Sequence, residues 1–166
     1  PRAIDPAQCA LLLIDFQARL MPSISDGDSA VANAVRLAKA AALLSVPVLG
    51  TEQNPAGLGP NVADLKGLCS DTFAKMHFDG TREAGFPEFL PDKASIVVAG
   101  CETHVCVMQT VLGLLATGRN VHLVRDAVGS RTIANRDAVI ERMARRGADI
   151  VTTEMVIFDW LGDCRN

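Results

Sequence analysis

Short apolar runs alternate with longer amphipathic segments along the whole chain. The apolar runs predict buried strands at residues 10–14, 46–51, 96–100, 121–124 and 150–152, and a short edge strand at 71–76. Apolar positions at helical spacing predict helices at 29–45, 105–117, 135–146 and 154–161. The Asn, Pro and Gly residues at 54–60 predict a surface loop.

The regular order of strands and helices determines the expected architecture. Such alternation favours a mostly parallel sheet with helices on both faces. We therefore expect one α/β domain over residues 1–166, with three α-β-α layers and a Rossmann-like sheet of about six strands. Asp26, Asp28 and Ser29 are candidate caps for the first long helix, and Gly118 follows the second.

Polar residues that directly follow the apolar strands are the candidates for chemistry. In open parallel sheets, ligands bind at the carboxyl ends of the strands, near the point where the strand order reverses. The candidates at these ends are Asp15, Glu52, Gln53, Lys75, the segment 100–106 and Asp126.

Cys106 is predicted to lie in the first turn of a helix. The positive end of the helix dipole lowers the pKa of a thiol there, and the free backbone N–H groups of the turn are suited to bind an oxyanion. The alternative is a small buried hydrophobic residue, the common fate of a free cysteine. We prefer that alternative for Cys9, Cys69 and Cys101.

Asp15 and Lys75 supply the charges that a thiol nucleophile requires. Burial of a carboxylate after an apolar strand is costly unless the carboxylate is paired, so Asp15 is a candidate general base and Lys75 its electrostatic partner. The alternatives are a loop cap for Asp15 and a solvated surface position for Lys75.

Three blocks of the sequence resemble the catalytic blocks of the isochorismatase-like hydrolases, in the same order. They are Leu12-Leu13-Ile14-Asp15-Phe16-Gln17, Phe73-Ala74-Lys75 and Gly100-Cys101-Glu102-Thr103-His104-Val105-Cys106-Val107. The similarity extends from about Ala10 to Trp160.

The resemblance implies a triad of Asp15, Lys75 and Cys106 and a cis peptide bond between Cys101 and Glu102. It also implies an oxyanion hole formed by the backbone N–H groups of Glu102 and Cys106. The implied activity is hydrolysis of an amide or carbamoyl-type C–N bond in a small molecule, through a thioester on Cys106.

Departures from the family pattern narrow the subgroup. Nicotinamidases carry metal-binding histidines after the second strand, whereas residues 51–55 here read Thr-Glu-Gln-Asn-Pro, so we expect neither a metal nor a cofactor. Isochorismatases proper lack the cysteine. The chain is most similar to the metal-free branch of YcaC-related and isochorismatase domain-containing proteins.

Residues next to the three blocks are candidate substrate contacts. They are Phe16, Leu20, Gln53, Asn54, His77, Thr103 and His104. His104 is equally well interpreted as a helix cap or an interface residue, and a surface loop position is favoured for His77.

Composition limits the classes of partner. The chain has 166 residues, 49% of them hydrophobic, a net charge of −3 and five scattered cysteines. These values favour a cytoplasmic protein that binds a small molecule and neither nucleic acid nor membrane. The apolar late helices and the resemblance imply a homo-oligomer, a dimer or larger. Two alternatives remain: a scaffold or binding protein without turnover, and a redox thiol with Cys101 as the resolving cysteine.

Overall fold

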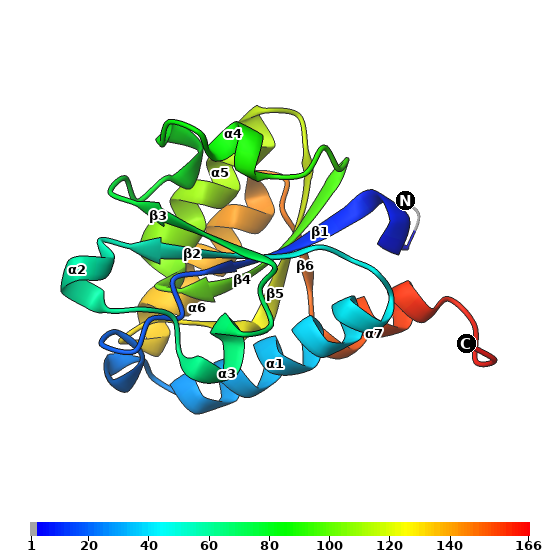
Figure 1. Ribbon diagram of the computed structural model, residues 1–166, viewed down its shortest axis with the longest axis horizontal. Helices are drawn as coiled ribbons and strands as arrows, with labels where there is room; N and C mark the ends of the chain where they lie inside the picture. Colours follow the sequence, from blue (N-terminus) through cyan, green and yellow to red (C-terminus); the bar gives the residue numbers. More distant parts are fainter. Residues whose placement is uncertain (1–2) are drawn as a thin grey trace.

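The computed structural model describes residues 3–166, in which strands and helices alternate (Figure 1). The strands are β1 (Cys9–Ile14), β2 (Val48–Gln53), β3 (Asp71–Lys75), β4 (Ser95–Cys101), β5 (Asn120–Gly129) and β6 (Asp149–Val151). The main helices are α1 (Gly27–Leu43), α5 (Met108–Ala116), α6 (Ile133–Arg145) and α7 (Thr153–Leu161). Short helices are α2 (Pro55–Leu58), α3 (Ala63–Lys66), α4 (Phe86–Phe89), the 3₁₀ turns η1 (Pro6–Gln8), η2 (Met21–Ser23) and η3 (Gly80–Arg82), and the π turn η4 (Thr103–Val107).

The six strands form one parallel sheet in the order β3-β2-β1-β4-β5-β6. The predicted fold class is confirmed, including the edge position of β3. The order of the strands reverses between β1 and β4, which are paired from Cys9 with Ser95 to Ile14 with Gly100. The ends of β1 and β4 are therefore the expected place for a site.

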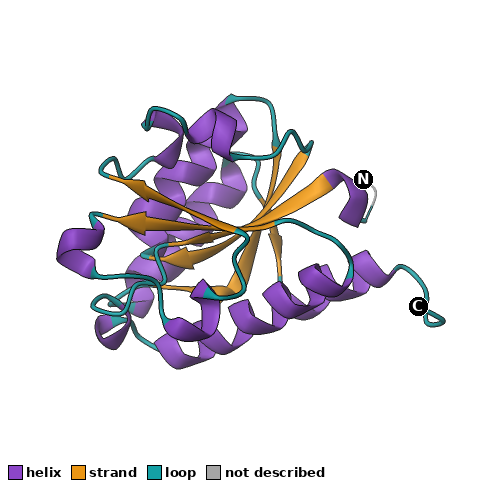
Figure 2. Cartoon of the chain, in the orientation of Figure 1, coloured by secondary structure: helices purple, strands orange, loops and turns teal. Residues whose placement is uncertain are grey.

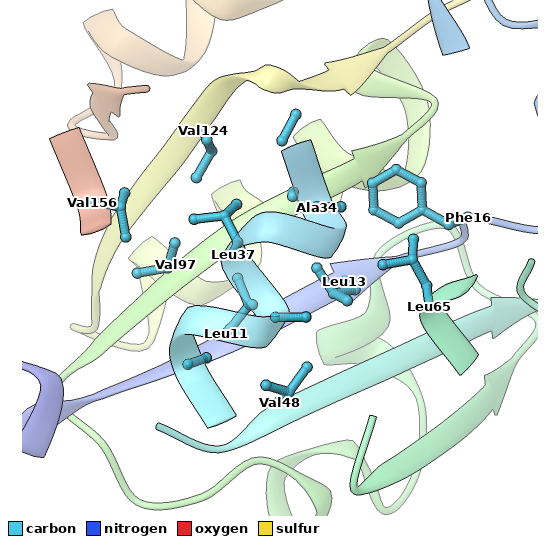
Figure 3. Packing of buried hydrophobic residues seen from close by; sticks show 14 of the residues in the cluster. Leu11, Leu13, Phe16, Ala34, Leu37, Val48, Leu65, Val97, Val124 and Val156 are labelled. Atoms are coloured by element: carbon cyan, nitrogen blue, oxygen red, sulfur yellow. The ribbon is translucent and has the colours of Figure 1, made fainter. Parts of the chain in front are cut away.

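Helices cover both faces of the sheet, so the domain has three layers (Figure 2). Successive side chains of a strand point to opposite faces, and β1 shows this directly. Leu11 and Leu13 belong to the cluster that packs under α1 and α7, part of which is drawn in Figure 3. Leu12 and Ile14 belong to the cluster under α5 and α6. Every residue of β1 is buried, which explains its uninterrupted apolar run.

Several boundaries differ from the sequence prediction. β2 begins at Val48 and ends at Gln53, so Glu52 and Gln53 lie within the strand and not after it. β5 continues through Asp126, with an irregular register opposite residues 98–100. The predicted loop at 54–60 contains the helical turn α2. The Asp26 side chain makes no capping hydrogen bond, although the residue occupies the N-cap position of α1.

Within residues 3–166, each helix is too short or too polar to cross a membrane.

Candidate active site

Asp15 lies immediately after β1 and is fully buried. Its backbone has a φ of 53°, in the left-handed region, which aspartate tolerates better than most residues. The Asp15 N–H donates to the Thr51 carbonyl at 3.2 Å, and the Thr51 hydroxyl donates to Asp15 Oδ1 at 2.8 Å. The end of β2 thus fixes both the backbone and the carboxylate of Asp15.

Lys75, the last residue of β3, brings its ammonium to this carboxylate. Lys75 Nζ donates to Asp15 Oδ2 at 2.9 Å and to Gln53 Oε1 at 2.6 Å. Neither side chain of the ion pair is exposed to solvent. Two buried charges of opposite sign side by side avoid the large cost of a buried single charge.

Cys106 reaches the same place from the end of β4. Gly100 has a φ of 149°, and a Cβ there would lie 2.3 Å from the Ile14 carbonyl oxygen, so only glycine fits where β4 passes β1. The peptide bond between Cys101 and Glu102 is cis, as the resemblance implies. Cys106 then lies within the π turn η4, which leads directly into α5.

The Glu102 carbonyl accepts from two N–H groups of this π turn, and neither belongs to Cys106. The N–H groups of Val105 and Val107 both donate to the Glu102 carbonyl, at 3.1 and 3.3 Å. The N–H of Cys106, which lies between them, makes no bond to that carbonyl among the described residues. Turns of this kind recur at functional sites because they alter the regular bonding of the helix.

The electrostatics of the thiol differ from the sequence prediction. Burial raises the pKa of Cys106 to about 12, and the negative charge of Asp15 adds to the rise while Lys75 opposes it. The expectation of a lowered thiol pKa was therefore wrong. The helix terminus supplies a favourable dipole, but removal from water and the neighbouring carboxylate dominate. Cys106 rests as a protonated thiol.

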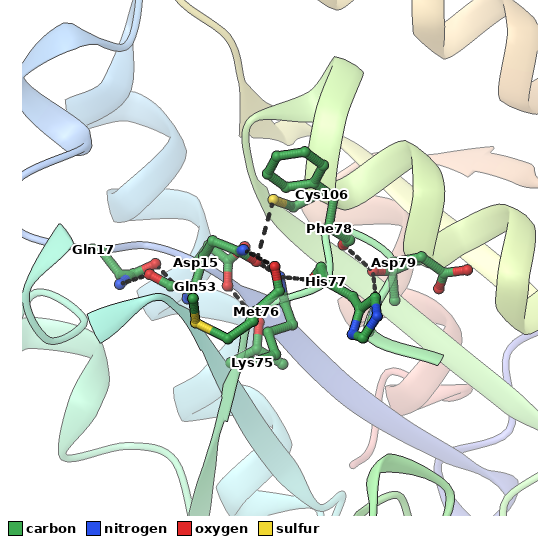
Figure 4. A network of polar contacts seen from close by, with 12 residues as sticks. Asp15, Gln17, Gln53, Lys75, Met76, His77, Phe78, Asp79 and Cys106 are labelled. Carbon is green, nitrogen blue, oxygen red and sulfur yellow. Dashed lines mark hydrogen bonds and ion pairs between the residues drawn. The ribbon is translucent and has the colours of Figure 1, made fainter. Parts of the chain in front are cut away.

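Gln53 contacts both Lys75 and Cys106 (Figure 4). Its Oε1 accepts from Lys75 Nζ and lies 3.9 Å from the Cys106 sulfur, while its Nε2 donates to the Met76 carbonyl at 2.7 Å. Gln17 holds the backbone of Gln53 through bonds of 2.9 Å to its carbonyl and 2.8 Å from its N–H. Gln53 therefore has a fixed amide orientation, with its oxygen toward the ammonium and the thiol.

A cavity of about 290 Å³ opens above these groups. Its lining residues are Asp15, Leu20, Gln53, Leu58, Phe78, Glu102, Val105, Cys106 and Arg131. Polar and charged groups lie beside four apolar side chains. A larger hollow of about 650 Å³, lined mainly by residues 81–94 and 114–120, shares no residue with this cavity.

Five of the predicted substrate contacts do not line the cavity. Phe16 follows Asp15, so its ring points to the opposite side and packs in the core under α1 (Figure 3). Asn54 is exposed at the start of α2. The His77 ring bonds to Glu83 at 2.8 Å, and His104 to Ser130 at 2.9 Å. Thr103 is completely buried, and its hydroxyl has no hydrogen-bond partner among residues 3–166.

The cavity also contains residues that sequence reasoning did not select. Leu58, Phe78, Val105 and Arg131 come from four separate segments. Phe78 and Val105 adjoin positions that were considered, whereas Leu58 and Arg131 lie four or more residues away from any such position. Proximity to the three sequence blocks was a usable signal for Phe78 and Val105 only. It did not tell which side chain of a loop turns inward.

No group of three or more metal-binding side chains gathers anywhere in the described part of the chain.

The fold and the site together define a class of protein. A parallel sheet in this strand order, with a buried carboxylate, ammonium and thiol at its reversal point, is an α/β domain with a candidate active site at the ligand-binding edge of the sheet. The Isochorismatase domain family model matches residues 9–155. The chain belongs to the isochorismatase family of hydrolases.

Individual relatives agree with this assignment. The chain is 36% identical over 166 residues to isochorismatase domain-containing protein 1 of Salmo salar, covering 95% of this chain and 57% of that protein. It is 38% identical over 161 residues to isochorismatase domain-containing protein 2 of Xenopus laevis, covering 94% and 77%. The chain thus spans little more than half the length of the Salmo salar protein.

Solved structures of similar proteins have the same fold. MAR1 ribonuclease from Caenorhabditis elegans is 34% identical with a TM-score of 0.92, covering 98% of this chain and 85% of that one. YcaC from Pseudomonas aeruginosa, solved with hexane-2,5-diol and covalent acrylamide, is 28% identical with a TM-score of 0.92, covering 99% and 85%. YcaC from Escherichia coli, described as an octameric hydrolase of unknown specificity, is 26% identical with a TM-score of 0.89, covering 99% and 84%.

Proposed function

We propose that this chain is a cysteine amidohydrolase that cleaves a C–N bond of a small amide or carbamoyl compound through a thioester on Cys106. One observation carries the proposal: a fully buried Asp15–Lys75 ion pair lies against a buried thiol at the floor of a small cavity. A structural protein has no evident need for two buried charges beside a cysteine, because apolar replacements are often as stable.

Charge balance explains why all three groups are needed. With the thiol protonated, the cluster of Asp15, Lys75 and Cys106 has a net charge of zero. Loss of the thiol proton to solvent would leave a buried net charge of −1, which burial opposes. Transfer of the proton from sulfur to the Asp15 carboxylate keeps the net charge at zero, with the thiolate facing the Lys75 ammonium.

The first half of the reaction follows from that transfer. The Cys106 thiolate attacks the carbonyl carbon and forms a C–S bond, and the carbonyl oxygen becomes an oxyanion. The backbone N–H groups of Glu102 and Cys106 stabilise this oxyanion. The tetrahedral intermediate collapses with cleavage of the C–N bond, and Asp15 passes its proton to the leaving nitrogen.

The second half releases the acid. Asp15, again a carboxylate, removes a proton from water as the water oxygen attacks the thioester carbonyl. The C–S bond breaks, the carboxylic acid leaves, and the thiol regains a proton from Asp15. The enzyme returns to its resting state without a metal or a redox step.

The net charge of −3 and the 290 Å³ cavity support a small molecule, and neither an RNA strand nor a lipid surface, as the partner. We therefore do not propose for this chain the ribonuclease activity that the name of the Caenorhabditis elegans relative states. The octameric state of Escherichia coli YcaC supports a homo-oligomer for this chain, which sedimentation will test. A cytoplasmic location remains part of the same proposal.

The experiment is a screen of primary amides, carbamates and N-carbamoyl compounds. Wild-type protein should release ammonia or amine from some of them, and Cys106→Ala should release none. Cys9→Ala, which changes another buried cysteine, should retain activity. Mass spectrometry of quenched reactions should find the acyl group on Cys106. Turnover by Cys106→Ala equal to that of wild type would overturn the proposal.

A further inference from the structure

The loop that follows β3 places an aromatic ring at the cavity. Phe78 lines the cavity together with Leu20, Leu58 and Val105, yet the residue is 51% exposed. A large apolar side chain in water gains by being covered, and a ligand in the cavity would cover it. The ring is thus a candidate contact for an apolar part of the substrate.

One carboxylate holds the start of this loop. Glu83 Oε2 accepts hydrogen bonds from the backbone N–H groups of Met76 and His77, both at 2.9 Å, and faces His77 Nδ1 at 2.8 Å. These hydrogen bonds lower the pKa of Glu83 to about 2, and the bonds from His77 contribute most. The carboxylate is therefore charged at neutral pH and ties residues 76 and 77, directly before Phe78, to residue 83.

A hydroxyl on α5 holds the other side of the loop. Thr110 is 1% exposed, and its Oγ1 accepts from the Gly80 N–H at 3.0 Å and donates to the Phe78 carbonyl at 3.3 Å. Because α5 continues directly from the turn that carries Cys106, this contact fixes the distance between Phe78 and the nucleophile. Figure 4 draws Phe78 and Cys106 in the same close view.

The charged residues of the cavity neutralise each other. Arg131 Nε lies 3.3 Å from Glu102 Oε1, and the Arg131 backbone N–H donates to Glu102 Oε2 at 3.1 Å. Asp15 is paired with Lys75. Apart from the uncharged Gln53 and Cys106, the remaining lining residues are apolar, so the cavity favours an uncharged acyl group. The cavity volume of 290 Å³ has room for on the order of ten non-hydrogen atoms of a ligand, if each fills the ~30 Å³ that a water molecule occupies.

We propose that Phe78 is the specificity-determining residue of the cavity and limits the enzyme to amides of short, uncharged acyl groups. Glu83 and Thr110 act as positioning residues that hold the ring at a fixed distance from Cys106. This inference rests on the proposed amidohydrolase function, and it makes a separate statement about which molecules reach the thiol.

The first test compares straight-chain primary amides from acetamide to octanamide. For wild-type protein, kcat/KM should fall sharply beyond a limiting chain length. Phe78→Ala should raise the ratio of kcat/KM for octanamide to that for propanamide by on the order of tenfold, the scale expected when a pocket gains room for methylene groups. The control is Phe158→Ala, which removes an exposed ring of α7 and should leave the ratio unchanged.

The second test measures the same selectivity without turnover. The rate of Cys106 alkylation by acrylamide is compared with the rate by the bulkier N-benzylacrylamide. Phe78→Ala should raise the bulky-to-small ratio, and Phe158→Ala should not. Thr110→Val should raise it by less, because the ring is still present but less fixed, whereas Thr117→Val on the same helix should have no effect.

The two tests separate the inference from the proposed function. If no amide is hydrolysed but the alkylation ratio shifts in Phe78→Ala, the amidohydrolase proposal is wrong and the role of Phe78 is supported. If amides are hydrolysed and neither ratio moves in Phe78→Ala, the role of Phe78 is overturned. Equal changes in both alkylation rates for Thr110→Val would reduce its role to general stability.

Discussion

An aspartate follows the apolar run of β1, and another follows the apolar run of β5. The two side chains lie in different environments. Asp15 after β1 is fully buried, and its carboxylate binds the Thr51 hydroxyl and the Lys75 ammonium. Asp126 in β5 is exposed, and its Oδ1 accepts from the N–H and the hydroxyl of Thr153 at 2.8 and 2.9 Å. One carboxylate belongs to the site, and the other holds the start of α7.

The difference comes from the place of each strand in the sheet. β1 is central and lies beside the reversal of strand order, so the ends of β2, β3 and β4 surround Asp15. β5 lies on one side of that point, and the segment next to Asp126 is the start of a helix. The same local pattern therefore yields a buried, ion-paired carboxylate in one place and a carboxylate that binds a helix start in the other.

The largest expected effect separates the two aspartates by activity. Asp15→Asn should lower kcat on an amide substrate by on the order of 10²–10⁴-fold, because it removes the proposed general base. Asp126→Asn should leave kcat within about twofold, since general acid–base effects need contact with the reacting groups. Steady-state kinetics measure both, with near-UV circular dichroism to verify folding. Similar kcat values for the two variants would remove Asp15 from the mechanism.

The second effect is the loss of folding stability when one partner of the buried ion pair is removed. Lys75→Met should reduce the free energy of unfolding by about 3–5 kcal/mol near pH 7, because Asp15 is left as an unpaired buried charge. Lys66→Met breaks the Lys66–Glu52 pair, in which the lysine is 48% exposed, and should cost less than about 1 kcal/mol.

Urea unfolding measures both variants. The double variant Asp15→Asn/Lys75→Met should recover part of the loss, because no single charge remains buried. A double variant less stable than Lys75→Met would contradict this explanation.

The third effect is a difference in pH dependence. Burial and Asp15 raise the pKa of the Cys106 thiol to about 12, so at pH 6–9 the thiol stays protonated. If the proton moves to Asp15, alkylation of wild type by iodoacetamide should vary little across this range, because no proton leaves the protein. In Asp15→Asn, the rate should rise about tenfold per pH unit below the thiol pKa, as the proton must reach solvent.

The sign of the pKa change provides a check on this prediction. Replacement of the Asp15 carboxylate by a neutral amide removes a charge that raises the pKa of Cys106, so the alkylation midpoint should lie below about 12. Asp126→Asn should retain the wild-type profile. Parallel pH profiles for wild type and Asp15→Asn would exclude proton transfer to Asp15.

The smallest effect is the loss of the hydrogen bonds that Asp126 accepts at the start of α7. Asp126→Ala should lower stability by about 1 kcal/mol, because the Thr153 N–H loses its acceptor. For a chain of this size, that corresponds to a decrease in Tm of about 2–4 °C. Differential scanning calorimetry measures the change, and kcat should stay near the wild-type value. A decrease in kcat well beyond about twofold, with Tm lowered by no more than about 2–4 °C, would place Asp126 in the site.

Much of the fold was readable because buried parallel strands appear as uninterrupted apolar runs. Leu11, Leu12 and Leu13 are all buried, as expected for an apolar run in a strand that is covered on both faces. The ends of β2 and β5 were misplaced because polar residues continue those strands. Glu52 and Gln53 lie within a strand, and their polarity resembled that of a loop.

The candidate triad was predictable for the same reason. Asp15, Lys75 and Cys106 come at or after the carboxyl ends of strands that the alternation places in one parallel sheet. The cavity wall was not predictable to this level. His77 and Phe78 are neighbours in one loop, and only the Glu83 contact and the Thr110 anchor decide that the histidine turns to solvent and the ring to the cavity.

The sequence by itself determined the layers of this protein and the edge of the sheet at which its candidate catalytic groups gather, because hydrophobic periodicity and chain direction are local properties. The tertiary structure alone decided the protonation of Cys106, the complete burial of the Asp15–Lys75 pair and the side chains that enclose the cavity. Those features depend on burial and on distances between segments far apart in the chain, and electrostatic energies change steeply with both.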